Sequence, residues 1–545
     1  MDQSNSPQAV DAVIVGAGFS GLYLLHRLRG LGFTTRVFER GTDVGGTWYW
    51  NRYPGARCDV ESMQYSYSFS DELQQEWQWS ERFSAQPEIL QYAKHVAERF
   101  DLRKDITFET SVEAAHFDEL TQRWSVHTDG GETLSARFCI MATGCISTAQ
   151  TPAIDGLEDY QGSTYHTGSW PHEGVDFSGQ RIAVVGTGSS GIQAIPVLAE
   201  QAAHVTVFQR TPNYSLPSQN GPMTPEYEAS WKANYDALRE EQRQTAKGTI
   251  RDANNEPALS VSDDERRRMF EERWAIGGAG FLSSYNDLLI DNDANGTAAE
   301  FVREKIRSIV KDPATAELLA PKTYPIGTKR ICIDSGYFQT YNRDNVELVD
   351  ISQQPIEKIT PTGLVANGTT FEFDSIVFAT GFDAMTGTLF RVDIAGREGR
   401  KLQDKWEAGP RTYLGVMSEG FPNLFMITGP GSPSVLSNMM VSIEQHVDWV
   451  TESIVNMRDN DLDLMEPELK AEDDWVEHVN HVAHQTLFPQ ANSWYMGANI
   501  PGKPRLFMPY IGGVGAYRKI CNEVVSDGYR GFRFAGSQMS ADAAD

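Results

Sequence analysis

Two glycine-rich turns of the same spacing lie 170 residues apart in this chain, and they constrain its fold more than any other feature. The first occupies residues 16–21 after the apolar run 12–15, and the second occupies residues 186–191 after the apolar run 182–185. Each pattern predicts a strand, a tight turn and a helix. Glycines in such a turn let the backbone approach a pyrophosphate, whose charge is stabilised at the helix N-terminus. The chain is therefore predicted to contain two dinucleotide-binding units.

The residue at the end of the second strand distinguishes the two units. Glu39 lies 23 residues after Gly16, whereas the equivalent position after Gly186 is Gln209, followed by Arg210. A carboxylate accepts hydrogen bonds from a ribose diol but repels a 2′-phosphate, and an arginine pairs with that phosphate through charge-assisted bonds. We therefore predict FAD at the first unit and NADPH at the second.

The composition argues against several other functions. The net charge of −27, from 74 acidic and 47 basic residues, argues against a nucleic acid or an anionic membrane surface as a partner. No run approaches the roughly 18 apolar residues that a membrane helix needs. The five cysteines show neither a CxxC motif nor metal-ligand spacing. We therefore expect no metal site, no disulfide reductase activity, and reduced thiols in a cytoplasmic enzyme.

Two apolar segments that end in Ala-Thr-Gly, residues 138–144 and 375–381, enclose the second glycine-rich turn. Each is predicted to be a strand at which the chain passes from one nucleotide-binding domain to the other. We therefore expect an FAD-binding domain built from residues 1–148 and 383–545, with an NADP-binding domain at residues 149–382 between them. The predicted fold class is α/β, with two nested Rossmann-like dinucleotide-binding domains.

Between about residues 220 and 325 the sequence pattern changes to that of charged helices. Ser262, with Glu265 three residues later, forms a capping box, and Asp312 followed by Pro313 is typical of a helix start. This segment is predicted to be a helical insertion in the NADP-binding domain, with its charges on a solvated face.

Three further stretches carry a family resemblance. They are residues 45–59, residues 160–171 just before the second glycine-rich turn, and residues 326–330. Together with the paired turns, they resemble the signature stretches of the type I Baeyer-Villiger monooxygenases, and the resemblance spans most of the chain. Residues 429–438 resemble the phenylacetone and steroid monooxygenase branch more than the cyclohexanone branch. One departure is Tyr160, where the family's pattern usually has phenylalanine.

The resemblance implies an FAD- and NADPH-dependent monooxygenase that converts aryl, cyclic or steroid-like ketones to esters or lactones with O2. In that reaction a flavin C4a-peroxide must stay deprotonated to attack the carbonyl, and this anion needs a fixed cation. Arg330 is the candidate, because a guanidinium keeps its proton and can also stabilise the oxyanion that follows. The resemblance implies that Asp59 holds Arg330. The expected partners are a ketone and O2, and we expect a monomer or a weak oligomer.

The turn patterns and the resemblance together assign the residues that contact each cofactor. For FAD they are Gly16, Gly18, Ser20, Gly21, Glu39, Thr47, Trp48, Asp59, Tyr65, the backbone of Val112, and Met439. For NADP they are Arg57, Thr187, Gly188, Ser189, Ser190, Gly191, Gln193, Arg210, Thr211, Lys329, Arg330 and Trp494. Adjacent side chains in an extended segment point to opposite faces, so Lys329 is assigned to the 2′-phosphate and Arg330 to the flavin.

Alternatives remain at several points. Lys329 and Arg330 could both clamp nucleotide phosphates, and Trp494 could be a buried residue of a C-terminal loop instead of part of a segment that closes on NADP and substrate. The alternative functions are a flavin monooxygenase that oxygenates nitrogen or sulfur, and a non-oxygenating NADPH oxidase flavoprotein. The first uses a protonated hydroperoxide and would not need an arginine over the flavin.

Overall fold

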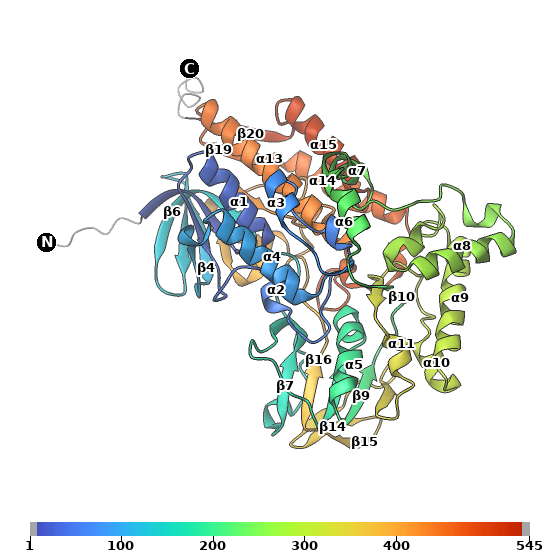
Figure 1. Ribbon diagram of the computed structural model, residues 1–545. Helices are drawn as coiled ribbons and strands as arrows, with labels where there is room; N and C mark the ends of the chain where they lie inside the picture. The colour runs from blue at the N-terminus through green and yellow to red at the C-terminus, as the bar shows by residue number, and fades with distance from the viewer. Residues whose placement is uncertain (1–7, 537–545) are drawn as a thin grey trace.

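The computed structural model describes residues 8–536, which form two largely parallel sheets with helices packed around them (Figure 1). The first sheet contains, in order, β17 (Asp393–Ala395), β4 (Val112–Asp118), β5 (Arg123–Thr128), β6 (Thr133–Met141), β1 (Gln8–Val15), β2 (Thr35–Phe38) and β3 (Ile106–Thr107), and β18 (Leu424–Met426) pairs with β6. The second contains β12 (Val346–Asp350), β9 (His204–Gln209), β8 (Arg181–Val185), β16 (Ser375–Phe378) and β7 (Ser163–His166). Each sheet belongs to one Rossmann-like unit, so the predicted fold class is confirmed.

Both glycine-rich turns form as expected. The first connects β1 to α1 (Phe19–Gly30), where Gly16 has φ = +107° and a Cβ added at Gly21 would lie 1.9 Å from the Gly16 oxygen. The second connects β8 to α5 (Ser189–Gln201), where Gly186 has φ = +109° and a Cβ at Gly191 would lie 2.3 Å from the Gly186 oxygen. Glycine is needed at all four positions, for its backbone conformation or for the close approach of helix and strand.

Strands from distant parts of the sequence complete the first sheet. β17 and β18, from the C-terminal part of the chain, pair in parallel with β4 and β6 from the N-terminal part. The second sheet is built entirely from the sequence between them. The FAD-binding unit is therefore assembled from two pieces around the NADP-binding unit, whereas the domain boundaries near residues 148 and 382 stay a prediction.

Helices fill the predicted insertion: α6 (Pro225–Lys232), α7 (Tyr235–Gln244), α8 (Asp263–Ile276), α9 (Asn292–Ile309) and α10 (Pro313–Leu319). The Ser262 side chain caps α8 by accepting a hydrogen bond from Glu265 N at 3.3 Å. Asp312 caps α10 in the same way, accepting from Thr315 N at 2.8 Å, and Pro313 is the first residue of that helix. Both helix starts are confirmed.

The two halves of the insertion pack against different cores. Trp231 of α6 and Tyr235 of α7 belong to the hydrophobic core of the FAD-binding unit. Phe270 of α8 and Phe301 of α9 belong to the core of the NADP-binding unit. The insertion therefore contacts both units and connects them outside the crossover strands.

The C-terminal part adds a long helix, α13 (Met439–Asp459), which packs against α1. The remaining helices are α2 (Thr47–Trp50), α3 (Asp71–Glu76), α4 (Gln86–Arg99), α11 (Tyr337–Thr340), α12 (Leu402–Lys405), α14 (Leu469–His484) and α15 (Val514–Ser526). Short strands form three small sheets. The first contains β10 (Ser215–Pro217) and β11 (Cys332–Asp334), and the second contains β13 (Lys358–Thr360), β14 (Gly363–Ala366) and β15 (Thr369–Glu372). The third contains β19 (Leu464–Pro467) and β20 (Phe532–Ala535).

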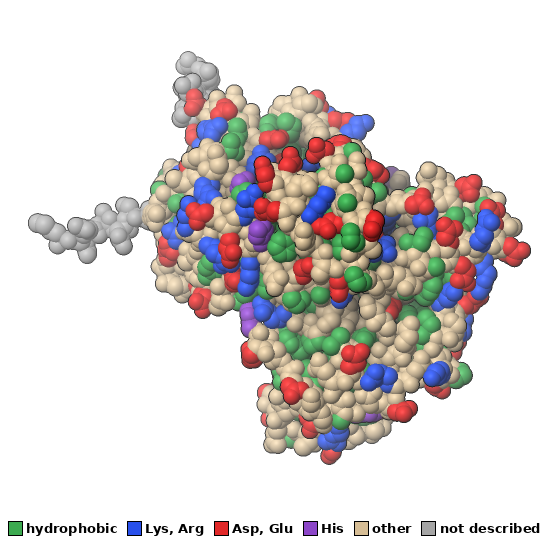
Figure 2. Space-filling model, viewed as in Figure 1, with side chains coloured by type: hydrophobic (Ala, Val, Ile, Leu, Met, Phe, Trp, Pro, Cys, Tyr) green, Lys and Arg blue, Asp and Glu red, His purple; other side chains and the backbone are tan. Residues whose placement is uncertain are grey.

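The surface carries mixed charge. Figure 2 shows acidic and basic side chains interspersed on the visible face. No helix within residues 8–536 has the length and apolar character needed to cross a membrane. In that same part of the chain, no group of three or more His, Cys, Asp or Glu side chains is arranged to hold a metal ion. All five cysteines are buried and unpaired.

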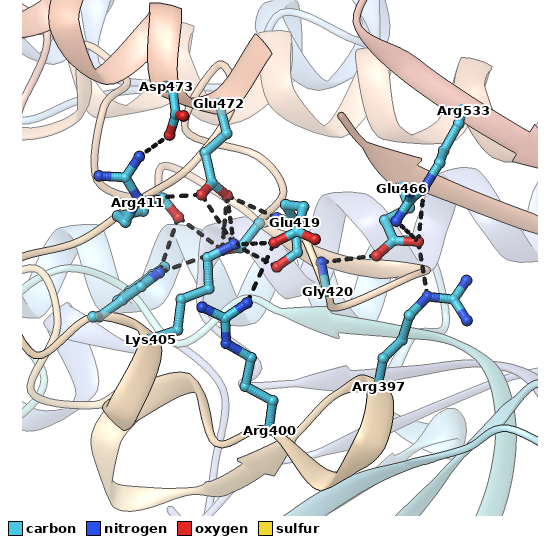
Figure 3. A network of polar contacts seen from close by, with 12 residues as sticks. Arg397, Arg400, Lys405, Arg411, Glu419, Gly420, Glu466, Glu472, Asp473 and Arg533 are labelled. Atoms are coloured by element: carbon cyan, nitrogen blue, oxygen red, sulfur yellow. Dashed lines mark hydrogen bonds and ion pairs between the residues drawn. The ribbon is translucent and has the colours of Figure 1, made fainter. Parts of the chain in front are cut away.

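A buried ion-pair network holds the C-terminal part together (Figure 3). Lys405, at the end of α12, lies 2.9 Å from Glu472 of α14, and the two side chains are 1% and 0% exposed. Lys405 also pairs with Glu419 at 3.0 Å, and Glu472 accepts a hydrogen bond from Glu419 N at 2.7 Å. Beside them, Glu466 of β19 pairs with Arg397 at 2.9 Å. The network therefore connects α12, α14 and β19, and each buried charge in it is stabilised by the opposite charges of its partners.

The Lys405→Met variant should lose about 3–5 kcal/mol in the free energy of unfolding, because it leaves Glu472 charged, buried and without its closest cation. Urea unfolding of the FAD-loaded protein, followed by tryptophan fluorescence, measures this loss. Lys470→Met is the matched control, since Lys470 pairs with Asp474 on the surface and its side chain is 81% exposed. A loss no larger than that of the control would contradict the prediction.

Candidate functional site

One ion pair joins three distant segments at the centre of the site. Arg330 donates to Asp59 Oδ2 from Nε at 3.1 Å and from Nη2 at 2.9 Å. Arg330 Nη1 also donates to the Val435 carbonyl at 3.3 Å. Asp59 belongs to the loop after α2, Arg330 follows the helical insertion, and Val435 precedes α13. The predicted partnership of Asp59 with Arg330 is therefore present in the geometry.

The environment of Arg330 keeps its guanidinium charged. Burial by itself would lower the pKa of Arg330, but the Asp59 carboxylate outweighs it and raises the pKa above its ordinary value. The Arg330 side chain is nevertheless 37% exposed, against 12% for Asp59. Arg330 is therefore accessible to a bound molecule, as a cation that acts on such a molecule must be.

Two further features of this pair were not predicted from the sequence. One is a carboxylate oxygen without a partner in the described part of the chain, and the other is the neighbouring Tyr495. Asp59 Oδ1 is buried and has no hydrogen-bond partner among residues 8–536, so it can accept a bond from a ligand or a water. Tyr495 is buried beside Arg330; burial raises the pKa of its phenol to about 12, although Arg330 opposes that rise. The one sequence feature that could have pointed to Tyr495 as a site residue is its position directly after Trp494.

The first glycine-rich turn fits the pyrophosphate and ribose of FAD. Gly18 precedes α1 and has no side chain to fill the space before the helix. Gly46 packs closely against it, since a Cβ added at Gly46 would lie 2.8 Å from the Gly18 Cα. Glu39 is buried, and its two carboxylate oxygens accept from the amides of Ala17 and Gly41, each at 2.8 Å. These bonds fix the carboxylate at the turn and leave lone pairs for a ribose diol.

The other expected FAD residues lie at the edges of the same region. Thr47 and Trp48 begin α2, and Trp48 Nε1 donates to the Tyr65 hydroxyl at 3.1 Å. The segment that leads to Val112 runs beside Glu39, because Thr110 N donates to the Glu39 carbonyl at 3.0 Å. Met439 is the first residue of α13. Ser20 lies one residue into α1 and is buried. Their contacts with FAD stay a prediction.

The second turn fits NADP and is tied to the FAD-binding unit. The Thr187 hydroxyl donates to the Thr211 carbonyl at 3.0 Å, and Gly188 leaves the N-terminus of α5 open in front of Ser189 and Ser190. Gln193 of α5 receives a hydrogen bond from the Tyr53 hydroxyl at 2.7 Å. The Gln193 amide also donates to the Arg57 carbonyl at 3.0 Å. The loop of the first unit therefore packs directly on the helix that would face the NADP pyrophosphate.

Arg57 is held differently from the other expected NADP residues. Its guanidinium donates to Glu81 and to the Phe83 carbonyl, and only its backbone contacts Gln193. Its link to the NADP-binding helix in this structure thus runs through the main chain. Trp494 is half-buried, packs in an apolar cluster with Val435 and lies 4.3 Å from Tyr495 between ring centroids.

Arg210 and Lys329 form a second cluster of positive charge. Burial first, and then the nearby Arg210 charge, lower the pKa of Lys329 to about 8. Lys329 Nζ lies 4.6 Å from the centre of the Tyr324 ring, and neither Lys329 nor Arg210 forms an ion pair with any carboxylate in residues 8–536. Two neighbouring cations without a counterion fit a phosphate, so both residues suit the predicted 2′-phosphate site.

Comparison with known proteins places this architecture in a family. Residues 13–327 match the family model described as pyridine nucleotide-disulphide oxidoreductase. A Baeyer-Villiger monooxygenase of Pseudooceanicola batsensis is 43% identical over 523 residues, which cover 95% of each chain. The solved structure of an oxidized steroid monooxygenase bound to NADP is 53% identical, with a TM-score of 0.93, and the match covers 97% of this chain and 100% of that one.

The chain belongs to the Baeyer-Villiger monooxygenase family. The identity with the steroid monooxygenase exceeds the 42–43% found with solved cyclohexanone monooxygenases, which confirms the predicted branch. As a Baeyer-Villiger monooxygenase family member, the chain uses FAD and NADPH, and solved relatives are complexes with both nucleotides. Another relative is a phenazine N-monooxygenase of Lysobacter antibioticus, which is 39% identical over 532 residues. The match covers 97% of each chain.

For this Baeyer-Villiger monooxygenase family member, the preference for NADPH over NADH should fall several-fold between neutral pH and about pH 9.5, because Lys329 loses its proton above its lowered pKa of about 8 and a neutral amine cannot pair with the 2′-phosphate. The ratio of kcat/KM values for the two coenzymes measures this effect and cancels the pH dependence of the later steps. Lys329→Arg is the control, since its ratio should stay constant. A constant ratio in the unmodified enzyme would contradict the prediction.

Proposed function

We propose that this protein inserts one oxygen atom of O2 beside the carbonyl of a ketone, forming an ester or a lactone and consuming one NADPH. Bound FAD and NADPH would supply the oxygen-activating and hydride-transfer chemistry. The substrate class that we propose is aryl, cyclic or steroid-like ketones, which is consistent with the 53% identity to a steroid monooxygenase. We also propose that it works in the cytoplasm as a monomer or a weak oligomer, a setting in which five unpaired buried cysteines stay reduced.

The observation that carries the proposal is the permanently charged guanidinium of Arg330, which Asp59 holds in a partly exposed position. Its charge can offset negative charge that develops in the site, including charge on the oxygen of the ketone carbonyl. Oxygenation of nitrogen or sulfur does not generate such an anion on the substrate and gains less from this arginine. The geometry thus favours ketone oxygenation over the reaction named for the N-monooxygenase relative.

Three features of the chain would support this role of Arg330. Asp59 orients the guanidinium through two hydrogen bonds to one oxygen. The Val435 carbonyl fixes Nη1, so that rotation of the head group would break a third bond. The apolar cluster around Trp494, which includes Leu436 and Phe507, would exclude water from the space beside the cation.

The purified FAD-loaded protein should oxidise NADPH faster when a ketone substrate is added, and should yield a product one oxygen atom heavier. A panel of aryl, cyclic and long-chain ketones, with gas chromatography of the products and parallel measurement of H2O2, tests this outcome. Consumption of NADPH that gives only H2O2 with every ketone would contradict ketone oxygenation. A nitrogen- or sulfur-containing substrate would then be tested for oxygenation, and its failure would leave NADPH oxidase activity.

Arg330→Ala should lower ester formation by at least about 10²–10³-fold, because it removes a fixed charge from the reacting centre. FAD content and the rate of flavin reduction by NADPH, measured by stopped-flow absorbance, should change little. Arg330→Lys is the matched variant; it keeps a charge without the planar fork and should recover part of the activity. Equal loss of reduction and ester formation would mean that Arg330 only clamps the coenzyme.

A further inference from the structure

A lysine that the predicted chemistry does not use, Lys247, lies in a loop that packs on the same segment of chain as Arg330. The carbonyl of Lys247 accepts a hydrogen bond from Asn438 N at 2.8 Å. Three residues earlier in the same segment, the Val435 carbonyl accepts from Arg330 Nη1 at 3.3 Å. The Lys247 carbonyl and the Arg330 guanidinium therefore both bind the short stretch of chain before α13, although Lys247 lies between α7 and α8 of the helical insertion and Arg330 follows the insertion.

The loop that carries Lys247 is fixed on its other side as well. Ile250 N donates to Gln64 Oε1 at 2.8 Å, and Gln64 directly precedes Tyr65. Gly248 has φ = +64°, and a Cβ there would lie 3.3 Å from the Val441 side chain. The loop is thus wedged between the segment of Tyr65 and the start of α13, the two segments expected to border the flavin.

The charge of Lys247 has no counterion. Its ammonium makes neither a hydrogen bond nor an ion pair with any of the residues 8–536, although the side chain is only partly exposed. Burial and the nearby Arg251 charge lower the pKa of Lys247 to about 8, so it stays mostly protonated at neutral pH. Arg251 in turn lies close enough to Arg330 for the two charges to interact.

A structural role does not account for this arrangement. Where the chain buries a lysine for structure, as at Lys405, two carboxylates surround it. Arg251 also has acidic neighbours, since Glu61 and Asp59 both favour its charged form. Among residues 8–536, Lys247 has no carboxylate of this kind beside it, as is also true of Lys329 at the predicted 2′-phosphate site, and a partly buried charge without a counterion is unfavourable unless a bound anion completes the site.

We propose that Lys247 binds a carboxylate on the ketone substrate, so that this enzyme prefers ketones that carry a negative charge; the inference rests on the proposed ketone oxygenation. The ketone carbonyl would lie toward Arg330, its hydrocarbon part against the apolar cluster of Val435 and Leu436, and its carboxylate toward Lys247. The balanced reaction is unchanged: the keto acid, O2, NADPH and a proton give the carboxylated ester, NADP⁺ and water.

A phosphate of the coenzyme is the other possible source of an anion. The cations assigned to the 2′-phosphate, Arg210 and Lys329, form a separate cluster, and the Arg210 charge is the one that acts on Lys329. The only neighbouring charge that acts appreciably on Lys247 is Arg251. The Lys247 loop packs instead on the segment of Tyr65 and on the start of α13, and this separation from the 2′-phosphate cluster is the reason to assign Lys247 to the substrate.

The test compares 3- and 4-(2-oxopropyl)benzoate with the matching neutral benzamides, in the FAD-loaded enzyme with NADPH. The unmodified enzyme should show a higher kcat/KM for at least one carboxylate than for its amide. Lys247→Met should lower this carboxylate-to-amide ratio by about tenfold, Lys247→Arg should keep it, and the surface control Lys311→Met should leave it unchanged. The KM for NADPH, measured in the same variants, reports on the coenzyme as the alternative source of the anion.

Binding separates failure of this inference from failure of the proposed function. Titration of the oxidised enzyme with each benzoate and benzamide in the presence of NADP⁺, followed by the flavin absorbance, reports affinity without turnover. Tighter binding of a benzoate that is lost in Lys247→Met supports the anion site even if no ester forms. Equal affinity and equal kcat/KM for acid and amide, or a raised KM for NADPH as the only effect of Lys247→Met, would overturn it.

Discussion

The hydrogen-bonded ion pair between Asp59 and Arg330 is the interaction on which the rest of the site depends. It holds a guanidinium that cannot lose its proton in a partly buried position, where an arginine without a counterion would be disfavoured. The pair also fixes the relative positions of a loop from the FAD-binding unit and a segment that follows the helical insertion. Any shift between the two units would therefore break the geometry of the one charge that the proposed reaction requires.

Asp59 and Arg330 are 271 positions apart in the sequence, and the nested topology explains how their relative geometry can still be fixed. His166 shows one of the connections: its Nε2 contacts the Gln150 carbonyl at 3.3 Å and the Thr380 hydroxyl at 3.2 Å, so it joins the two crossover segments. Burial lowers the pKa of His166, as expected for a neutral structural residue and not for a base poised at neutral pH. The helices of the insertion, which pack on both cores, provide a second connection.

The parts of this site that sequence could predict are those encoded by local patterns. The glycine turns, Glu39, Arg210 and the caps at Ser262 and Asp312 depend on residues within about one βαβ unit of each other, where spacing determines geometry. The pairing of Asp59 with Arg330 came instead from family resemblance. Tyr495 and the Val435 carbonyl were missed because their contact with Arg330 depends on how the C-terminal part packs, which no local pattern in the sequence encodes.

The role proposed for Lys247 could not be predicted from a local sequence pattern either. It follows from where charges lie in the protein and which of them are paired. The protein has a net charge of −27, so at long range it repels anions, and an anionic substrate or coenzyme must be attracted by cations inside the site. Most basic side chains in the structure are neutralised by neighbouring carboxylates, as the Lys405 network shows. Within the described part of the chain, two sets of cations without a carboxylate partner lie near the expected ligands: Arg210 with Lys329, and Lys247 in the loop that packs on the start of α13. Since the first fits the coenzyme phosphate, the second is best explained by a charge on the molecule that the coenzyme helps to oxidise.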